Sequence, residues 1–120
     1  MIKIGFIGAG NMGTALAKAA VACDGVSVYL YDKDEEKAAA AAKAIGAEFS
    51  SNITIASECD YIFLAVKPNI IPFAAAEIST TLKSRSGYTV VSMAAGVSLD
   101  SLAAAFAGVD APIISCRKSP

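Results

Sequence analysis

The chain begins with Met1-Ile-Lys-Ile-Gly-Phe-Ile-Gly-Ala-Gly-Asn-Met-Gly13, and this stretch decides the fold. Its apolar run from Ile2 to Ile7 predicts a buried strand, and the alanine-rich run 14–22 predicts a helix. The pattern Gly8-x-Gly10-x-x-Gly13 lies between them. In this context the three glycines allow a tight turn, the approach of a pyrophosphate and close packing of helix on strand. The phosphates would meet free N–H groups at the positive end of the helix, so the stretch predicts a dinucleotide-binding site.

A second feature is the acid that follows the next predicted strand, 26–31. Asp32 stands 24 positions after the first glycine of the loop, close to where an acid accepts hydrogen bonds from the adenosine ribose. An acid there disfavours a 2′-phosphate, so Asp32 favours NAD over NADP. Asp34 suits the N-cap of the following helix better, which leaves Asp32 free for the ribose. Lys33 and Lys37 could instead meet a 2′-phosphate, so NADP stays open.

Length and charge exclude several classes of protein. The 120 residues indicate one domain, and the net charge of −1 offers no electrostatic footprint for nucleic acid or an anionic membrane. No apolar run reaches the ~18–20 residues that span a bilayer. The N-terminus also lacks the small-residue cleavage site of a signal peptide. We therefore expect a soluble, cytoplasmic protein with no nucleic-acid or membrane partner.

The side chains that usually carry catalysis or bind metals are scarce. The chain has no histidine, which excludes Ser-His-Asp and Cys-His catalysis and a histidine-ligated metal. Its three cysteines, Cys23, Cys59 and Cys116, are far apart and form no CxxC pattern, so we expect reduced thiols and no metal site.

Strand and helix signals alternate along the chain, as is typical of a Rossmann-like, doubly wound α/β domain with a mainly parallel sheet and helices on both faces. In the helix that Ser98 caps, Leu99, Leu102, Ala103 and Phe106 mark one face. Ligands bind beyond the carboxyl ends of the strands in such a sheet, so the residues at those ends should line one crevice. Strands are predicted at 2–7, 26–31, 47–49, 61–66, 89–93 and 111–115, and helices at 14–22, 35–44, 53–58, 71–83 and 98–107.

Three motifs together resemble the pyrroline-5-carboxylate reductases, over residues 1 to about 114. They are Gly8-Ala-Gly-Asn-Met-Gly13, Ala65-Val-Lys-Pro68 and Val91-Ser-Met-Ala-Ala-Gly-Val-Ser98. The resemblance implies an NAD(P)H-dependent oxidoreductase that makes proline by reducing a cyclic imine, 1-pyrroline-5-carboxylate. On this basis residues 1–120 are the dinucleotide-binding domain.

The resemblance also implies where the cofactor binds. The loop would hold the pyrophosphate, Asp32 and Lys33 would face the adenosine ribose, and Asn52 would lie near the adenine. The segment after the fourth strand would border the nucleotide, and the segment after the fifth would lie against the nicotinamide. The cofactor-binding residues are then Gly8, Ala9, Gly10, Asn11, Met12, Gly13, Asp32, Lys33, Asn52, Ala65, Val66, Lys67, Pro68, Met93, Ala94 and Ala95.

The tail departs from the family. Ser115-Cys-Arg-Lys-Ser-Pro120 stands where the family has an Arg-Val-Met-Pro-Asn-Thr-Pro-like segment, and the family's helical, dimerising substrate domain has no counterpart here. Catalytic residues therefore remain unassigned, and we expect the chain alone, whether a fragment or a natural truncation, to bind nucleotide but turn over poorly. Ile113 and Ile114, with the neighbouring helix, are expected to form an exposed apolar patch that promotes self-association.

Two alternatives stay open. One is a non-catalytic NAD(P)-binding module. The other is the cofactor domain of a hydroxyacid or 6-phosphogluconate-type dehydrogenase, against which the Ala65-Val-Lys-Pro68 motif argues.

Overall fold

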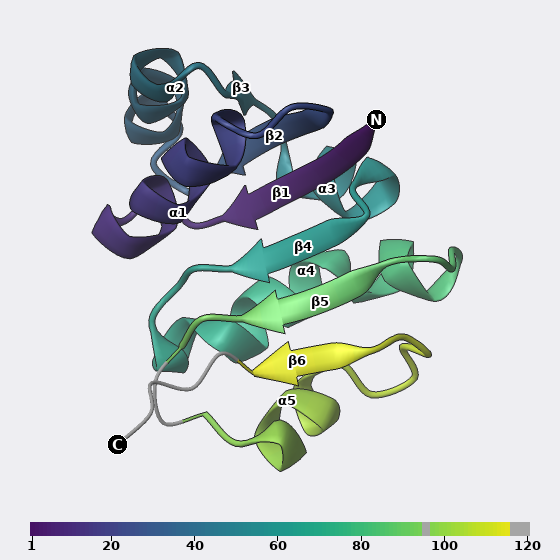
Figure 1. The fold of residues 1–120 in the computed structure, drawn as a ribbon. Coiled ribbons are helices and arrows are strands. Elements are labelled where there is room, and N and C mark those ends of the chain that lie inside the picture. The colour runs from purple at the N-terminus through teal and green to yellow at the C-terminus, as the bar shows by residue number, and fades with distance from the viewer. Residues whose placement is uncertain (95–96, 116–120) are drawn as a thin grey trace.

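Figure 1 shows a twisted sheet with helices on both of its faces. The structure, a computed structural model, describes residues 1–94 and 97–115. Within these ranges the sheet has six strands in the order β3-β2-β1-β4-β5-β6, and every neighbouring pair is parallel. The alternating pattern predicts a doubly wound, mainly parallel sheet, and the structure confirms this fold class. The strands are β1 (Ile2–Ile7), β2 (Val26–Tyr31), β3 (Glu48–Phe49), β4 (Tyr61–Leu64), β5 (Thr89–Ser92) and β6 (Ile113–Ser115).

The helices divide between the two faces of the sheet (Figure 1). Two of them, α1 (Asn11–Val21) and α2 (Glu35–Ile45), cover β1 and β2 on one face. The other face carries α3 (Asn52–Glu58), α4 (Ile71–Lys83) and α5 (Leu99–Ala105), with a short 3-10 helix, η1 (Pro68–Ile70), leading into α4. None of the helices in the described part of the chain is long and apolar enough to cross a membrane.

Each face of the sheet has its own hydrophobic core, because successive residues of a strand point to opposite faces. In β1, Phe6 packs under α1 and α2, whereas Ile7 packs under α3 and α4. Small residues bring the helices close to the strands: Ala17 of α1 and Ala38 of α2 are both fully buried. Phe6 also stacks on Phe63 of β4, with ring centroids 4.9 Å apart.

The helix caps follow the predicted pattern, whereas some strand boundaries differ. Asp34 caps α2, Gly46 ends it with a φ of +85°, and Ser98 caps α5. Strand β4 ends two residues earlier than predicted, since the segment from Ala65 leaves the sheet toward η1. Strand β6 begins after Pro112, which has no N–H to donate to the ladder.

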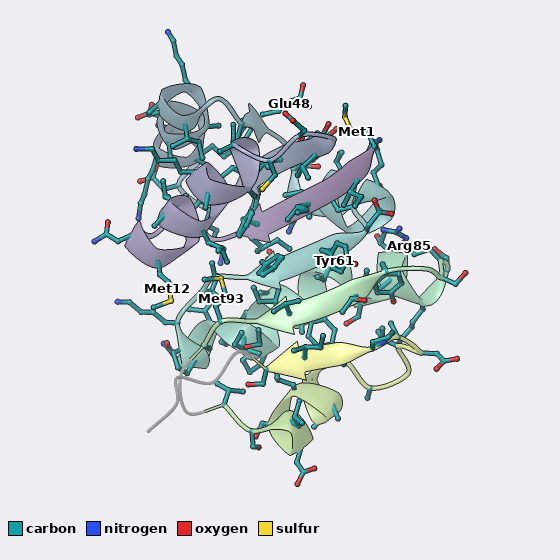
Figure 2. All side chains as sticks on the ribbon, in the orientation of Figure 1. Met1, Met12, Glu48, Tyr61, Arg85 and Met93 are labelled. Carbon is teal, nitrogen blue, oxygen red and sulfur yellow. The ribbon has the colours of Figure 1, made fainter. Side chains whose placement is uncertain are left out.

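The expected patch at Ile113 and Ile114 requires correction. Ile113 packs against the core under α4 and α5, whereas Ile114 is 50% exposed on the opposite face. The two side chains separate because neighbouring residues of a strand alternate between faces. Ile114 instead shares its face with Tyr61, which is 42% exposed and points away from the ribbon of β4 in Figure 2. We call this surface, Tyr61 and Ile114 with Phe63 and Val91 between them, the open face.

Candidate functional site

The loop from Gly8 to Gly13 joins β1 to α1 and is shaped by its contacts with the neighbouring strands. Gly8 has a φ of +116°, and its N–H donates to the carbonyl oxygen of Tyr31 at 2.7 Å. A β-carbon at Gly8 would collide with the carbonyl of Ala65, and one at Gly13 would lie 2.7 Å from the β-carbon of Ala65. The fold therefore requires glycine at both positions, because the loop packs directly on the residue after β4.

Gly10 differs from the other two glycines. Its φ of −74° and ψ of 179° are open to any residue, and a β-carbon there would meet no atom within 4 Å. Gly10 is the N-cap of α1 but has no side chain to cap the first N–H groups of the helix. The contacts of the fold therefore do not require a glycine at this position.

Asp32 lies directly after β2, and two backbone N–H groups hold its carboxylate. Oδ2 accepts from Ala9 N–H at 2.8 Å, and Oδ1 accepts from Asp34 N–H at 3.0 Å. Asp34 in turn accepts from Lys37 N–H at 3.1 Å, as its predicted capping role requires. Asp34 rather than Asp32 is thus the N-cap of α2, as predicted, and each oxygen of Asp32 accepts one backbone hydrogen bond. Because a carboxylate oxygen has two lone pairs, each can still accept from a further donor.

A cleft of about 490 Å³ opens at the carboxyl ends of β1, β2 and β4. It lies at the boundary between β1 and β4, where the order of the strands reverses and where open α/β sheets bind ligands. Its lining comes from three parts of the chain. These are Ile7, Gly8 and Gly10 of β1 and the loop; Tyr31, Asp32, Lys33 and Lys37 around the start of α2; and Ala65, Val66, Lys67, Ile70, Phe73, Ala74 and Glu77 between β4 and the middle of α4.

The cleft carries groups of both charges. Burial raises the pKa of the Tyr31 phenol, and the nearby carboxylates of Glu77, Glu35 and Asp32 raise this pKa further. The phenol therefore stays protonated at neutral pH and remains a hydrogen-bond donor. Exposed ammonium groups at the cleft suit a ligand with several negative charges; they belong to Lys33, Lys37 and Lys67.

The residues predicted for the nicotinamide half lie after β5. Met93 is half-buried and packs against the core under α1 and α2, and Ala94 is buried with its N–H donating to Ser92 Oγ at 3.3 Å. Ala95 lies outside the described residues. Met12 is 67% exposed in the first turn of α1, and Figure 2 shows Met12 and Met93 at the same carboxyl edge of the sheet.

The structure thus brings only part of the predicted set into the cleft. Asn52 is the first residue of α3 and Pro68 the first of η1, and neither lines it. The loop residues Ala9 and Gly13 are buried, while Asn11 and Met12 are exposed at the start of α1. Those that do line the cleft are Gly8, Gly10, Asp32, Lys33, Ala65, Val66 and Lys67.

Comparison with known proteins places the chain among the oxidoreductases. A family model described as "NADP oxidoreductase coenzyme F420-dependent" matches residues 3–96. The chain belongs to this family. The chain is 40% identical over 116 residues to the pyrroline-5-carboxylate reductase of Escherichia coli (strain K12), across 93% of the chain and 42% of that protein. It is 35% identical over 106 residues to pyrroline-5-carboxylate reductase 2 of Homo sapiens, across 84% of the chain and 32% of that protein.

Solved structures agree with these matches. The pyrroline-5-carboxylate reductase of Coxiella burnetii superposes with a TM-score of 0.78 at 26% identity, over 93% of this chain and 42% of that one. The pyrroline carboxylate reductase of Plasmodium falciparum with NADP bound gives 0.77 at 27% identity, over 95% and 41%. The resemblance seen in the three motifs is therefore confirmed. The chain spans less than half the length of these relatives.

One wall of the cleft was not predicted from the sequence. Ile70, Phe73, Ala74 and Glu77 follow the helical spacing i, i+3, i+4, i+7 and line the cleft together. A second stripe on the same helix, Ile71, Ala75, Ile78 and Leu82, is buried in the core. The spacing alone does not tell which of two adjacent stripes faces the core, so the cleft stripe could be recognised only with the sheet in place.

Proposed function

We propose that this chain is the cofactor-binding domain of a pyrroline-5-carboxylate reductase, which binds NAD(P)H and reduces 1-pyrroline-5-carboxylate to proline. The observation that carries the proposal is Gly10, a glycine at a helix N-terminus that no contact within the fold requires. A glycine is needed at this position if a pyrophosphate lies close to the backbone, because any side chain would stand in its way. The names of the relatives support a reductase over a purely binding module or a hydroxyacid-type dehydrogenase.

The residues present fit a dinucleotide. The N–H groups of Asn11, Met12 and Gly13 begin a helix of 11 residues, whose positive end favours phosphate. Phe73 and Ile70 offer apolar surface for the adenine within the cleft, while Asp32 and Lys33 lie where the ribose would bind. We assign Asn52 to the adenine side, Ala65, Val66, Lys67 and Pro68 to the border of the nucleotide, and Met93, Ala94 and Ala95 to the nicotinamide end.

When bound, a reduced nicotinamide would supply the hydride for the imine carbon. The protein would bind and orient the cofactor and shield it from water. For this chain that means holding the two phosphates on the loop and the adenosine in the cleft. The small-molecule imine is the substrate we propose for the whole protein. A cytoplasmic location fits the free thiols of Cys23 and Cys59 among the described residues.

We further propose that NADH is preferred over NADPH. A 2′-phosphate would add negative charge beside the Asp32 carboxylate, which its two backbone bonds hold in place. Lys33 and Lys37 are the cations that oppose this preference, since both line the cleft and could neutralise a 2′-phosphate. The relative from Plasmodium falciparum has NADP bound, so the preference has to be measured on this chain.

Calorimetric titration with NADH and NADPH tests the proposal. We expect saturable binding of both, tighter for NADH, and a loss of about tenfold or more in NADH affinity for Gly10→Ala. Urea unfolding of Gly10→Ala should match the wild type, because its new methyl group meets nothing. In the matched variant, Gly13→Ala, the added methyl group meets Ala65, so the free energy of unfolding should fall by about 1–3 kcal/mol. Unchanged NADH affinity in Gly10→Ala would show that no phosphate approaches the loop there.

A further inference from the structure

Asp32 connects two parts of the site that lie far apart in the sequence. Its Oδ2 accepts the N–H of Ala9, which belongs to the glycine loop, across a separation of 23 residues. Its Oδ1 accepts the N–H of Asp34, in the turn that begins α2. One carboxylate therefore ties the loop after β1 to the turn after β2.

The Ala9 peptide group is held on its other side as well. The carbonyl oxygen of Ala9 accepts the hydroxyl of Thr14 at 3.2 Å, and Gly8 N–H donates to Tyr31 at 2.7 Å. The first two N–H groups of the loop are thus taken up by β2 and Asp32. The N–H groups that follow Gly10 begin α1, and no side chain caps them.

This arrangement gives Asp32 a second task. We propose that Asp32 is a positioning residue for the phosphate loop: by holding Ala9 N–H, its carboxylate fixes the loop in the conformation that receives the pyrophosphate, so ribose and phosphate recognition are coupled through one side chain. The proposal rests on the cofactor binding proposed above. A hydrogen bond to an ionised group is stronger than one between neutral groups, so its loss should loosen the loop measurably.

The test needs a nucleotide that reaches the loop without contacting Asp32 through its ribose. 2′,3′-Dideoxy-ADP keeps the base and both phosphates but lacks the two hydroxyls that a ribose acceptor would bind. We expect Asp32→Ala to bind it about tenfold more weakly than the wild type, from the loss of a hydrogen bond to a charged group. Asp32→Asn keeps one oxygen that can accept from Ala9 N–H, so it should recover most of this affinity. Equal binding of dideoxy-ADP by wild type and Asp32→Ala would overturn the proposal, since a ribose contact alone predicts no loss.

The matched control is Asp34→Ala. Asp34 lies in the same turn, but its side chain accepts from Lys37 N–H and caps α2 instead of holding the loop. Its removal should lower the free energy of unfolding by about 1 kcal/mol and leave dideoxy-ADP affinity unchanged. If Asp34→Ala weakened binding as much as Asp32→Ala, the loss would reflect the turn as a whole and contradict the proposal.

A second measurement separates this proposal from the proposed function. Amide hydrogen exchange in the ligand-free protein reports the Ala9 N–H directly. We expect slow exchange at Ala9 in the wild type and in Asp34→Ala, and faster exchange in Asp32→Ala. If the wild type bound neither NADH nor ADP, the proposed function would fail. The exchange rate of the Ala9 N–H would still test whether Asp32 positions the loop. Equal exchange rates at Ala9 in wild type and Asp32→Ala would refute the positioning role by themselves.

Discussion

Gly8, Gly10 and Gly13 share one loop, but only Gly8 and Gly13 are required by a neighbour within the fold, Ala65. Gly8 turns the chain under the carbonyl of Ala65, and Gly13 lets α1 rest on the Ala65 side chain. A β-carbon added at Gly10 would meet no atom of the protein within 4 Å. At the scale of single residues, the fold and the ligand therefore make separate demands on the same motif, and substitutions can test them separately.

A second prediction at the residue scale concerns the thiol of Cys59 and the pH dependence of stability. Burial raises its pKa from 9.0 to about 12, with Asp60 and Glu58 adding to the effect and Arg85 opposing it. Because the folded pKa lies above the unfolded one, this contribution to stability is complete below pH 9 and is lost as the pH rises through about 12. Urea unfolding between pH 8 and 11 should show a steeper decline for the wild type than for Cys59→Ala. Parallel declines would mean that Cys59 ionises as easily in the folded state as in the unfolded state.

At the scale of elements, α3 and α4 are joined by one side chain. Arg85, just after α4, donates from Nη1 to the carbonyl oxygens of Ala56 at 2.7 Å and Cys59 at 2.8 Å. Its guanidinium also lies 4.8 Å from the centroid of the Tyr88 ring. Arg85 thus satisfies carbonyls at the end of α3, where Ala56 and Cys59 are buried.

We expect Arg85→Ala to lower the free energy of unfolding by about 1–3 kcal/mol, because it leaves two buried carbonyl groups without this donor. Urea unfolding measures the change, with Lys43→Ala, an exposed residue in the last turn of α2, as the control. A stability equal to that of the control would show that water replaces Arg85 at no cost.

The cleft stripe of α4 gives another prediction at this scale. Phe73 is 65% exposed although it lines the cleft, so the fold buries little of its ring, and we expect the proposed dinucleotide to cover it. Phe73→Ala should leave the free energy of unfolding within about 0.5 kcal/mol of the wild type and weaken NADH binding about tenfold. Calorimetry and urea unfolding of the same sample check both parts. Full NADH affinity in Phe73→Ala would show that this stripe is not part of the dinucleotide site.

The order and type of nearly every element were predicted from the sequence. The predictions were wrong or incomplete where contacts between residues distant in the sequence determine the structure. The loop, Asp34 and Ser98 were recognised because local geometry determines turns and caps. The face assigned to α5 was partly wrong, since Leu102 and Phe106 are buried but Leu99 is 56% exposed. The hydrogen bond between Asp32 and Ala9 could not be foreseen either, because it joins residues that only the folded sheet brings together.

At the scale of the whole molecule, the open face is the surface that the described helices leave uncovered. Tyr61 and Ile114 are its exposed apolar residues, and Figure 2 shows Tyr61 in front of the sheet. We expect the chain to self-associate through this face at high concentration. Light scattering should give a molar mass that rises with concentration for the wild type and stays lower for Ile114→Lys. The matched control is Leu99→Lys, at an exposed leucine of α5, which should behave as the wild type; a monomeric wild type at every concentration would contradict the expectation.

The central claim is that a nicotinamide dinucleotide binds across the carboxyl ends of β1, β2 and β4. The most direct test is an NMR titration, in which NADH is added to the ¹⁵N-labelled chain and the backbone amide signals are monitored. The account predicts that the amide signals of Asn11, Met12 and Gly13 move most, together with those of Tyr31 and Lys67 at the cleft. Shifts confined to other parts of the chain, or no shifts at saturating NADH, would contradict it.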